Sequence, residues 1–105
     1  MNIINPEEGT LVYEMDGAVG KKLLSKTDVE VVRIELDPGS SLPVHRTPVD
    51  VFFYIIEGSG EIEVGGESKT VEKGSVVESP KEIPHGLRNH SDGTLKVLVV
   101  KTPRP

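Results

Sequence analysis

A chain of 105 residues with 35% hydrophobic side chains has the length of one globular domain, which we place at residues 1–105. It contains no cysteine, and this excludes a disulfide framework and a thiolate zinc site. Its formal net charge of -5 comes from 17 acidic and 12 basic residues mixed along the chain, and the lack of a basic stripe predicts that it does not bind nucleic acid.

The first third of the chain has no persistent helical pattern. Residues 1–8 lack the basic start and the apolar run of a signal peptide, and no later segment approaches the roughly 18 apolar residues of a membrane span. We therefore expect a cytoplasmic protein that does not contact membranes. Residues 19–27 are the nearest candidate for a helix, although Gly17 and Gly20 weaken it.

Two segments in the middle of the chain have the patterns of strands. In residues 29–36, Val32, Ile34 and Leu36 share one phase, which is the period of a half-buried strand. Residues 51–56 differ because all six are apolar or aromatic. Such a strand needs a cover on both faces, and we interpret the second cover as another copy of the chain in a homodimer.

Further short strands follow at close spacing. A two-residue glycine turn at positions 65–66 joins residues 61–64 to residues 69–72, and two more strands are expected at residues 75–78 and 94–100. Eleven glycines and eight prolines supply many turns. Eight or nine short strands favour an all-β sandwich or small barrel.

Two glycine-framed segments each contain one histidine, and their spacing resembles the two motifs of the cupin superfamily. The first family motif is Gly, five residues, His-x-His, three or four residues, Glu, six residues, Gly. The second is Gly, five residues, Pro-x-Gly, two residues, His, three residues, Asn. The residues in register are Gly39, His45 and Gly58 for the first motif, and Gly74, Pro80, His85 and Asn89 for the second.

The resemblance implies a double-stranded β-helix, or jelly-roll barrel, whose motif side chains point inward and hold a divalent metal ion. This chain has Thr47 and Val51 where the family pattern has its second histidine and its glutamate. It also has Glu82 where the second motif usually has glycine. Of the four expected metal ligands, His45 and His85 remain as a pair.

Two imidazoles fall short of the three ligands of a catalytic zinc site, and of the two histidines and one carboxylate of a non-haem iron site. Asp50 supplies the carboxylate only if a bulge or a later strand start turns it inward, because it is one residue out of phase with Val51. A divalent metal of unknown identity at His45, His85 and Asp50 is one alternative. The other is a metal-free pair that is hydrogen-bonded to Thr47, a backbone carbonyl or water.

The resemblance leaves three functions open. The first is an enzyme in which the histidines hold a metal or transfer protons, since cupins include dioxygenases, isomerases and epimerases. The second is a ligand-binding or sensor module without catalysis, and the third is a protein with only a packing role. For a small-molecule ligand the expected contacts are Thr47, Val51, Phe53 and Asn89, although Asn89 suits a structural hydrogen-bonding role better.

Overall fold

The computed structural model describes residues 1–105, and its regular structure is almost entirely β. The predicted all-β class is confirmed. The only helix is the short 3-10 turn η1 (Pro6–Glu8), and no helix has the length and apolar character needed to cross a membrane. The strands are β1 (Thr10–Met15), β2 (Ala18–Lys26), β3 (Val29–Leu36), β4 (Ser41–His45), β5 (Asp50–Glu57), β6 (Ser59–Val64), β7 (Glu67–Glu72), β8 (Val76–Ser79), β9 (His85–Arg88) and β10 (Leu95–Thr102).

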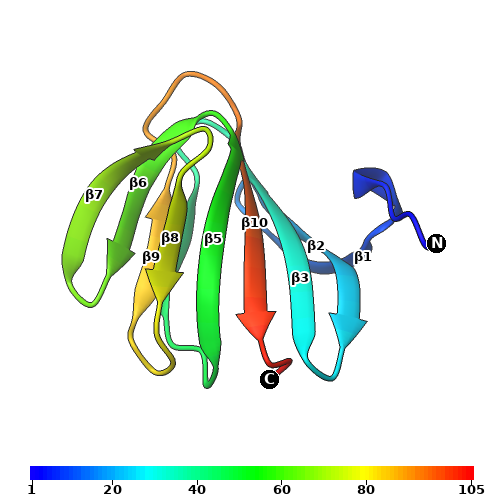
Figure 1. Ribbon diagram of the computed structural model, residues 1–105. Helices are drawn as coiled ribbons and strands as arrows, with labels where there is room; N and C mark the ends of the chain where they lie inside the picture. The colour runs from blue at the N-terminus through cyan, green and yellow to red at the C-terminus, as the bar shows by residue number, and fades with distance from the viewer.

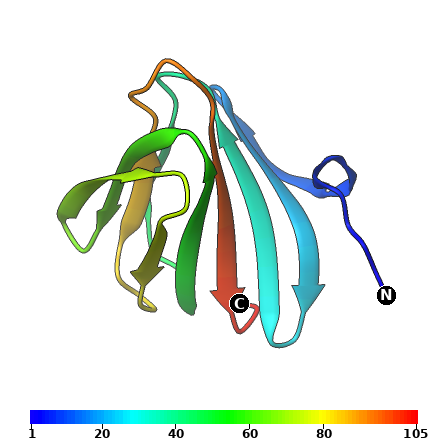
Figure 2. The same cartoon turned by 45° about the horizontal axis from the view of Figure 1, so that its top comes forward.

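The strands form two antiparallel sheets that face each other. One sheet has six strands in the order β1-β2-β3-β10-β5-β8, and the other has four in the order β4-β9-β6-β7. Figure 1 shows the four-stranded sheet on the left, and β5, β10, β3 and β2 of the larger sheet towards the right. The turned view in Figure 2 places the N-terminal segment with η1 outside the two sheets, beyond β1.

The hydrophobic core lies between the sheets and is built by strand alternation. On β3, the inward phase of Val32, Ile34 and Leu36 is confirmed, since all three side chains are buried. The four-stranded sheet contributes fewer core residues because it has fewer strands and because its outer strand β7 is mostly exposed. The core cluster consists of Ala18, Val32, Ile34, Leu36, Val51, Phe53, Ile55, Ile62, Val71, Leu87, Leu95, Val97 and Val99.

The candidate helix at residues 19–27 is wrong, because this segment is strand β2. It pairs with β1 on one side and β3 on the other, so its backbone groups are satisfied by ladders rather than by helical hydrogen bonds. Gly20 fits this position because a Cβ there would lie 2.8 Å from Cδ1 of Ile34. The predicted glycine turn is confirmed, since Gly65 and Gly66 have φ angles of 60° and 83° between β6 and β7.

The apolar strand 51–56 lies within β5, and it has one covered face and one open face. Phe53 points into the core and is 1% exposed. Phe52 and Tyr54 point to the outer side of the six-stranded sheet and are 36% and 39% exposed. The chain itself therefore does not cover this outer face, and the homodimer stays a prediction.

Candidate functional site

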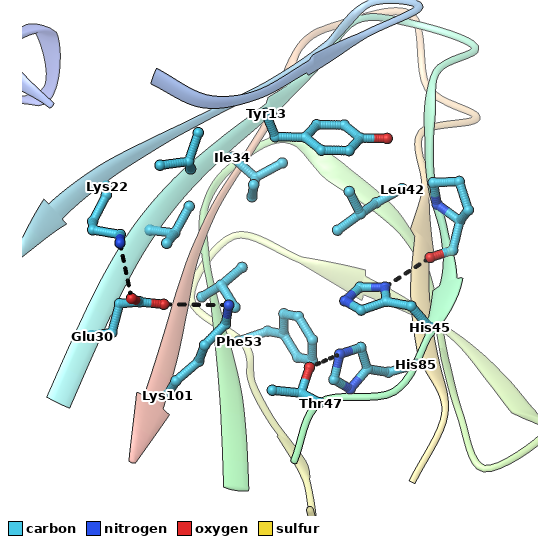
Figure 3. A pocket seen from close by; sticks show the side chains of 14 residues that line it. Tyr13, Lys22, Glu30, Ile34, Leu42, His45, Thr47, Phe53, His85 and Lys101 are labelled. Atoms are coloured by element: carbon cyan, nitrogen blue, oxygen red, sulfur yellow. Dashed lines mark hydrogen bonds and ion pairs between the residues drawn. The ribbon is translucent and has the colours of Figure 1, made fainter. Parts of the chain in front are cut away.

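A cavity of about 480 Å³ opens between the two sheets. Figure 3 shows a histidine-bearing wall on one side, an ionic group on the other, and apolar side chains between them. Its volume is in the range of small-molecule sites in proteins. The side chains lining it are Val12, Tyr13, Lys22, Glu30, Val32, Ile34, Leu42, Pro43, His45, Thr47, Phe53, His85, Val99 and Lys101.

His45 is the last residue of β4 and lies at the solvent-exposed part of the cavity wall. Its Nδ1 is 2.9 Å from the carbonyl oxygen of Pro43. Because a carbonyl oxygen only accepts hydrogen bonds, Nδ1 must carry the hydrogen in the neutral ring. Nε2 of His45 therefore keeps a free lone pair that can accept a hydrogen bond from a ligand.

His85 begins β9 and is 2% exposed. Its Nδ1 lies 2.7 Å from Oγ of Ser79, and its Nε2 lies 3.3 Å from Oγ1 of Thr47. Burial, together with the nearby charges of His45 and Lys101, lowers the pKa of His85 from 6.5 to about 4. His85 is therefore a neutral ring at physiological pH, and both of its nitrogens already have hydrogen-bonding partners.

Phe53 and Thr47, two of the residues predicted to contact a ligand, line the cavity together with the histidines. The ring of Phe53 packs edge to face on His85, with centroids 5.2 Å apart. Thr47 is buried and contacts the same imidazole through its hydroxyl. Val51 does not line the cavity: it is 4% exposed and belongs to the hydrophobic core, although it shares the inward phase of Phe53.

Asn89 also lies away from the cavity, and its side chain is fully used inside the protein. It is 0% exposed, and its amide donates to the carbonyl oxygens of Leu36 at 2.9 Å and Gly93 at 2.8 Å. Its Oδ1 accepts hydrogen bonds from the backbone NH and the hydroxyl of Ser91. The structure therefore assigns Asn89 a structural role and leaves it no group for a ligand in the cavity.

Asp50 does not reach the histidines either. Its carboxylate is exposed and accepts a hydrogen bond from the backbone NH of Lys81 at 2.9 Å. No bulge occurs where β5 begins, since Asp50 and Val51 pair in sequence with Thr102 and Lys101 of β10. Strand alternation therefore turns the Asp50 side chain outward while its neighbour turns inward.

The residues at the histidine pair do not fit the metal site of the family pattern. No group of three or more His, Asp or Glu side chains in the structure is arranged to hold a metal ion. Thr47 supplies only a hydroxyl, and that hydroxyl already contacts Nε2 of His85. One free imidazole nitrogen, on His45, is fewer than the three protein ligands that a catalytic zinc site needs.

The cavity also contains an ionic group that the sequence interpretation missed. The carboxylate of Glu30 lies 3.2 Å from Nζ of Lys22 and 3.3 Å from Nζ of Lys101. Burial alone would raise the pKa of Glu30, but the hydrogen bonds and charges of the two lysines outweigh it and hold that pKa below its usual value. A signal was present, because Glu30 shares the inward phase of Val32 and Ile34 on β3.

Comparison with known proteins agrees with the β fold described above. The family model described as "Cupin domain" matches residues 32–101. The chain belongs to the cupin family. The match begins within β3 and ends at Lys101, so it includes both histidine segments but not β1 and β2, which form the outer part of the larger sheet.

Relatives of this cupin are similar over almost its whole length. An uncharacterized protein of Aquifex aeolicus is 26% identical over 109 residues, covering 94% of this chain and 86% of that protein. The solved structure of KdgF from Halomonas sp. is 21% identical with a TM-score of 0.87, covering 99% and 96% of the two chains. A predicted oxalate decarboxylase from Thermotoga maritima is 24% identical with a TM-score of 0.84, covering 97% and 99%. These likenesses confirm the double-stranded β-helix.

Proposed function

We propose that this cupin binds a small organic molecule in the cavity between its sheets, without a metal ion. The observation that supports this most is the free Nε2 of His45 at the wall of a cavity of about 480 Å³. A concave site with mainly apolar walls and a few placed polar groups is typical of small-molecule binding. His45 would accept a hydrogen bond from a ligand hydroxyl or NH.

The arrangement of His85 supports binding rather than acid-base catalysis. A general acid or base needs a proton position that faces the substrate and a pKa near the working pH. Both ring nitrogens of His85 contact protein hydroxyls, and its pKa of about 4 keeps it neutral. We assign His85 the role of positioning Thr47 and supporting the ring of Phe53.

A thermal-shift screen tests this function. Sugars, alcohols, amides, amines and organic acids are added at millimolar concentration, and compounds that raise Tm are measured by calorimetry. We expect at least one to bind with one site per chain and to bind about tenfold more weakly to His45→Ala, since one hydrogen bond is lost. His90→Ala, which changes an exposed histidine outside the cavity, is the control.

Two results would contradict the proposal. If no compound class raises Tm, the cavity does not bind small molecules of this size. If binding requires added zinc, nickel, manganese or iron, the metal-free form of the proposal is wrong. Long incubation of a bound compound, followed by its recovery unchanged, separates binding from turnover.

A further inference from the structure

We infer that the ligand is an organic acid whose carboxylate binds the ammonium groups of Lys22 and Lys101 on the wall opposite the histidines. This inference rests on the proposed function, since it names the chemical class of the molecule that the cavity holds. It concerns three residues of β2, β3 and β10 that meet at one side of the cavity, Lys22, Glu30 and Lys101. We call them the ionic triad.

The first argument is the charge of the triad. Glu30 carries one negative charge between two ammonium groups, so the triad has one positive charge in excess. Glu30 is the only acidic side chain among the residues lining the cavity. His85 is neutral at physiological pH. The cavity wall therefore attracts an anion.

The second argument is that the triad has spare hydrogen-bond donors. Each ammonium group has three N–H donors, and Glu30 occupies the donor that faces it on each side. The side chains of Lys22 and Lys101 are 37% and 24% exposed, whereas that of Glu30 is 7% exposed. The Glu30 carboxylate is thus covered, whereas both ammonium groups remain accessible from the cavity. A site for an incoming carboxylate requires such accessible donors.

The third argument is position. Lys22 pairs with Val32 on the inner face of the sheet, and Lys101 follows Val99 by two residues on that same face. Figure 3 shows the triad across the cavity from His45 and His85. The charge of Lys101 is one cause of the lowered pKa of His85, so its field extends to the histidine side. A carboxylate bound at the triad would be within that field.

A purely structural role for the triad does not explain why it has two lysines. One lysine is enough to neutralise Glu30, whereas a second leaves an unbalanced positive charge on a half-buried wall. An anionic ligand supplies the missing charge. The apolar side chains between the two walls, including Ile34 and Phe53, would contact the body of the acid. A donor group at its far end would bind Nε2 of His45.

Matched pairs of probes test the inference. Calorimetry compares benzoate with benzamide, 4-hydroxybenzoate with 4-hydroxybenzamide, and glucuronate with glucuronamide at low salt. Each pair has the same shape and differs in charge. We expect the acids to bind at least about tenfold more tightly than their amides, and we expect added sodium chloride to weaken only the acids.

Two substitutions should act in opposite directions. Lys101→Gln removes the excess charge and should weaken binding of the acids about tenfold. Glu30→Gln frees both ammonium groups and should tighten it by a similar factor. The controls are Lys96→Gln and Glu57→Gln, a lysine and its carboxylate partner at 3.1 Å that lie outside the cavity lining, and they should change nothing. Circular dichroism checks that each variant is folded.

The outcomes separate the inference from the proposed function. If amides bind as tightly as acids, or if only neutral compounds of the screen bind, the inference is overturned and the proposed function stands. If neither the acids nor any compound of the screen binds, the proposed function fails and the inference fails with it. Should Glu30→Gln not fold, the acid-amide difference and the Lys101→Gln variant still decide the result.

Discussion

The imidazole rings of His45 and His85 meet edge to face, with centroids 4.7 Å apart and an interplanar angle of 89°. The two residues are direct partners in the pairing of β4 with β9. Burial, and next the neighbouring ring of His45, disfavour a charge on His85 and lower its pKa. Protonation of His85 therefore affects the free energy of unfolding of the protein.

The free energy of unfolding should fall as the pH drops from about 6.5 to about 4. In the unfolded chain His85 has its ordinary pKa of 6.5, whereas in the folded protein the pKa is about 4. The unfolded state therefore binds more protons in this window, and stability rises with pH there. We expect His85 to contribute about 1–3 kcal/mol, measured by urea unfolding at several pH values.

The variant His85→Gln should lose this part of the pH dependence. His90→Gln is the matched control, because the side chain of His90 is 68% exposed. An unchanged slope between pH 4 and 6.5 in His85→Gln would show that other groups cause the effect.

Replacing Glu82 with glycine should stabilise the protein. Glu82 has a φ of 66°, and the NH of Ile83 donates to the carbonyl oxygen of Pro80, so Glu82 is the third residue of a turn that favours glycine. The left-handed region costs a residue with a side chain about 1–2 kcal/mol, and the flexibility of glycine in the unfolded chain offsets part of this. We expect a gain of about 0.5–1 kcal/mol in urea unfolding, but not in Glu82→Ala.

Thr47→His should create a metal site with three histidines. A histidine at position 47 would bring a third imidazole to His45 and His85, which is the ligand number of a catalytic zinc site. After loading with zinc and dialysis, elemental analysis should find about one equivalent in the variant and little in the natural protein. Stoichiometric zinc in the natural protein, lost in His45→Ala, would contradict this.

Asn89→Ala should be strongly destabilising without changing the cavity. The substitution leaves the buried carbonyl oxygen of Leu36 without its side-chain donor and removes the acceptor of Ser91. Loss of several buried hydrogen bonds predicts a decrease of about 2–4 kcal/mol in the free energy of unfolding. Ser91→Ala should cost less, because Ser91 is only partly buried. A decrease below about 1 kcal/mol in Asn89→Ala would refute the structural role.

We expect the outer face of β5 to form a homodimer. Phe52, Tyr54 and the 62% exposed Val76 of the adjacent strand β8 form an apolar surface that water would otherwise contact. Light scattering should give about twice the chain mass of 11.4 kDa. Tyr54→Lys should shift the protein to monomer, whereas Leu11→Lys, at an exposed position of β1, should not. A monomer at all concentrations would disprove the interface.

The strands that were predicted correctly are those whose pattern is local. Alternation predicted β3, and the glycine turn predicted the β6–β7 hairpin. Strands β4 and β9 lie inside the two proline-containing motifs, and they are strands because β9 pairs with β4 on one side and β6 on the other. Strand β2 has no clear alternation, since its pairing with β3 shifts between Lys22 and Leu24.

The candidate site also combines features that the sequence predicts with features that depend on strand pairing. The resemblance to the cupin motifs predicted the pair of His45 and His85. Asp50 was a candidate third ligand only if a bulge turned it inward, and β5 has no bulge there. The ionic triad depends on the register of β2 and β3 with β10, which lies far from both in the sequence. Single-strand patterns contain no information about that register, so the triad required the structure.

The hydrogen bonds of Asn89 have a mechanical consequence. Asn89 follows β9 of the small sheet and binds the end of β3 at Leu36, whereas the cavity lies near Glu30 at the beginning of β3 and His85 at the beginning of β9. The two sheets are thus joined at one end through Asn89, and near the cavity through the contact between Ser79 of β8 and His85 of β9 at 2.7 Å. Amide protons beside Asn89 should exchange slowly, and a bound ligand should slow exchange mainly at the strands that line the cavity.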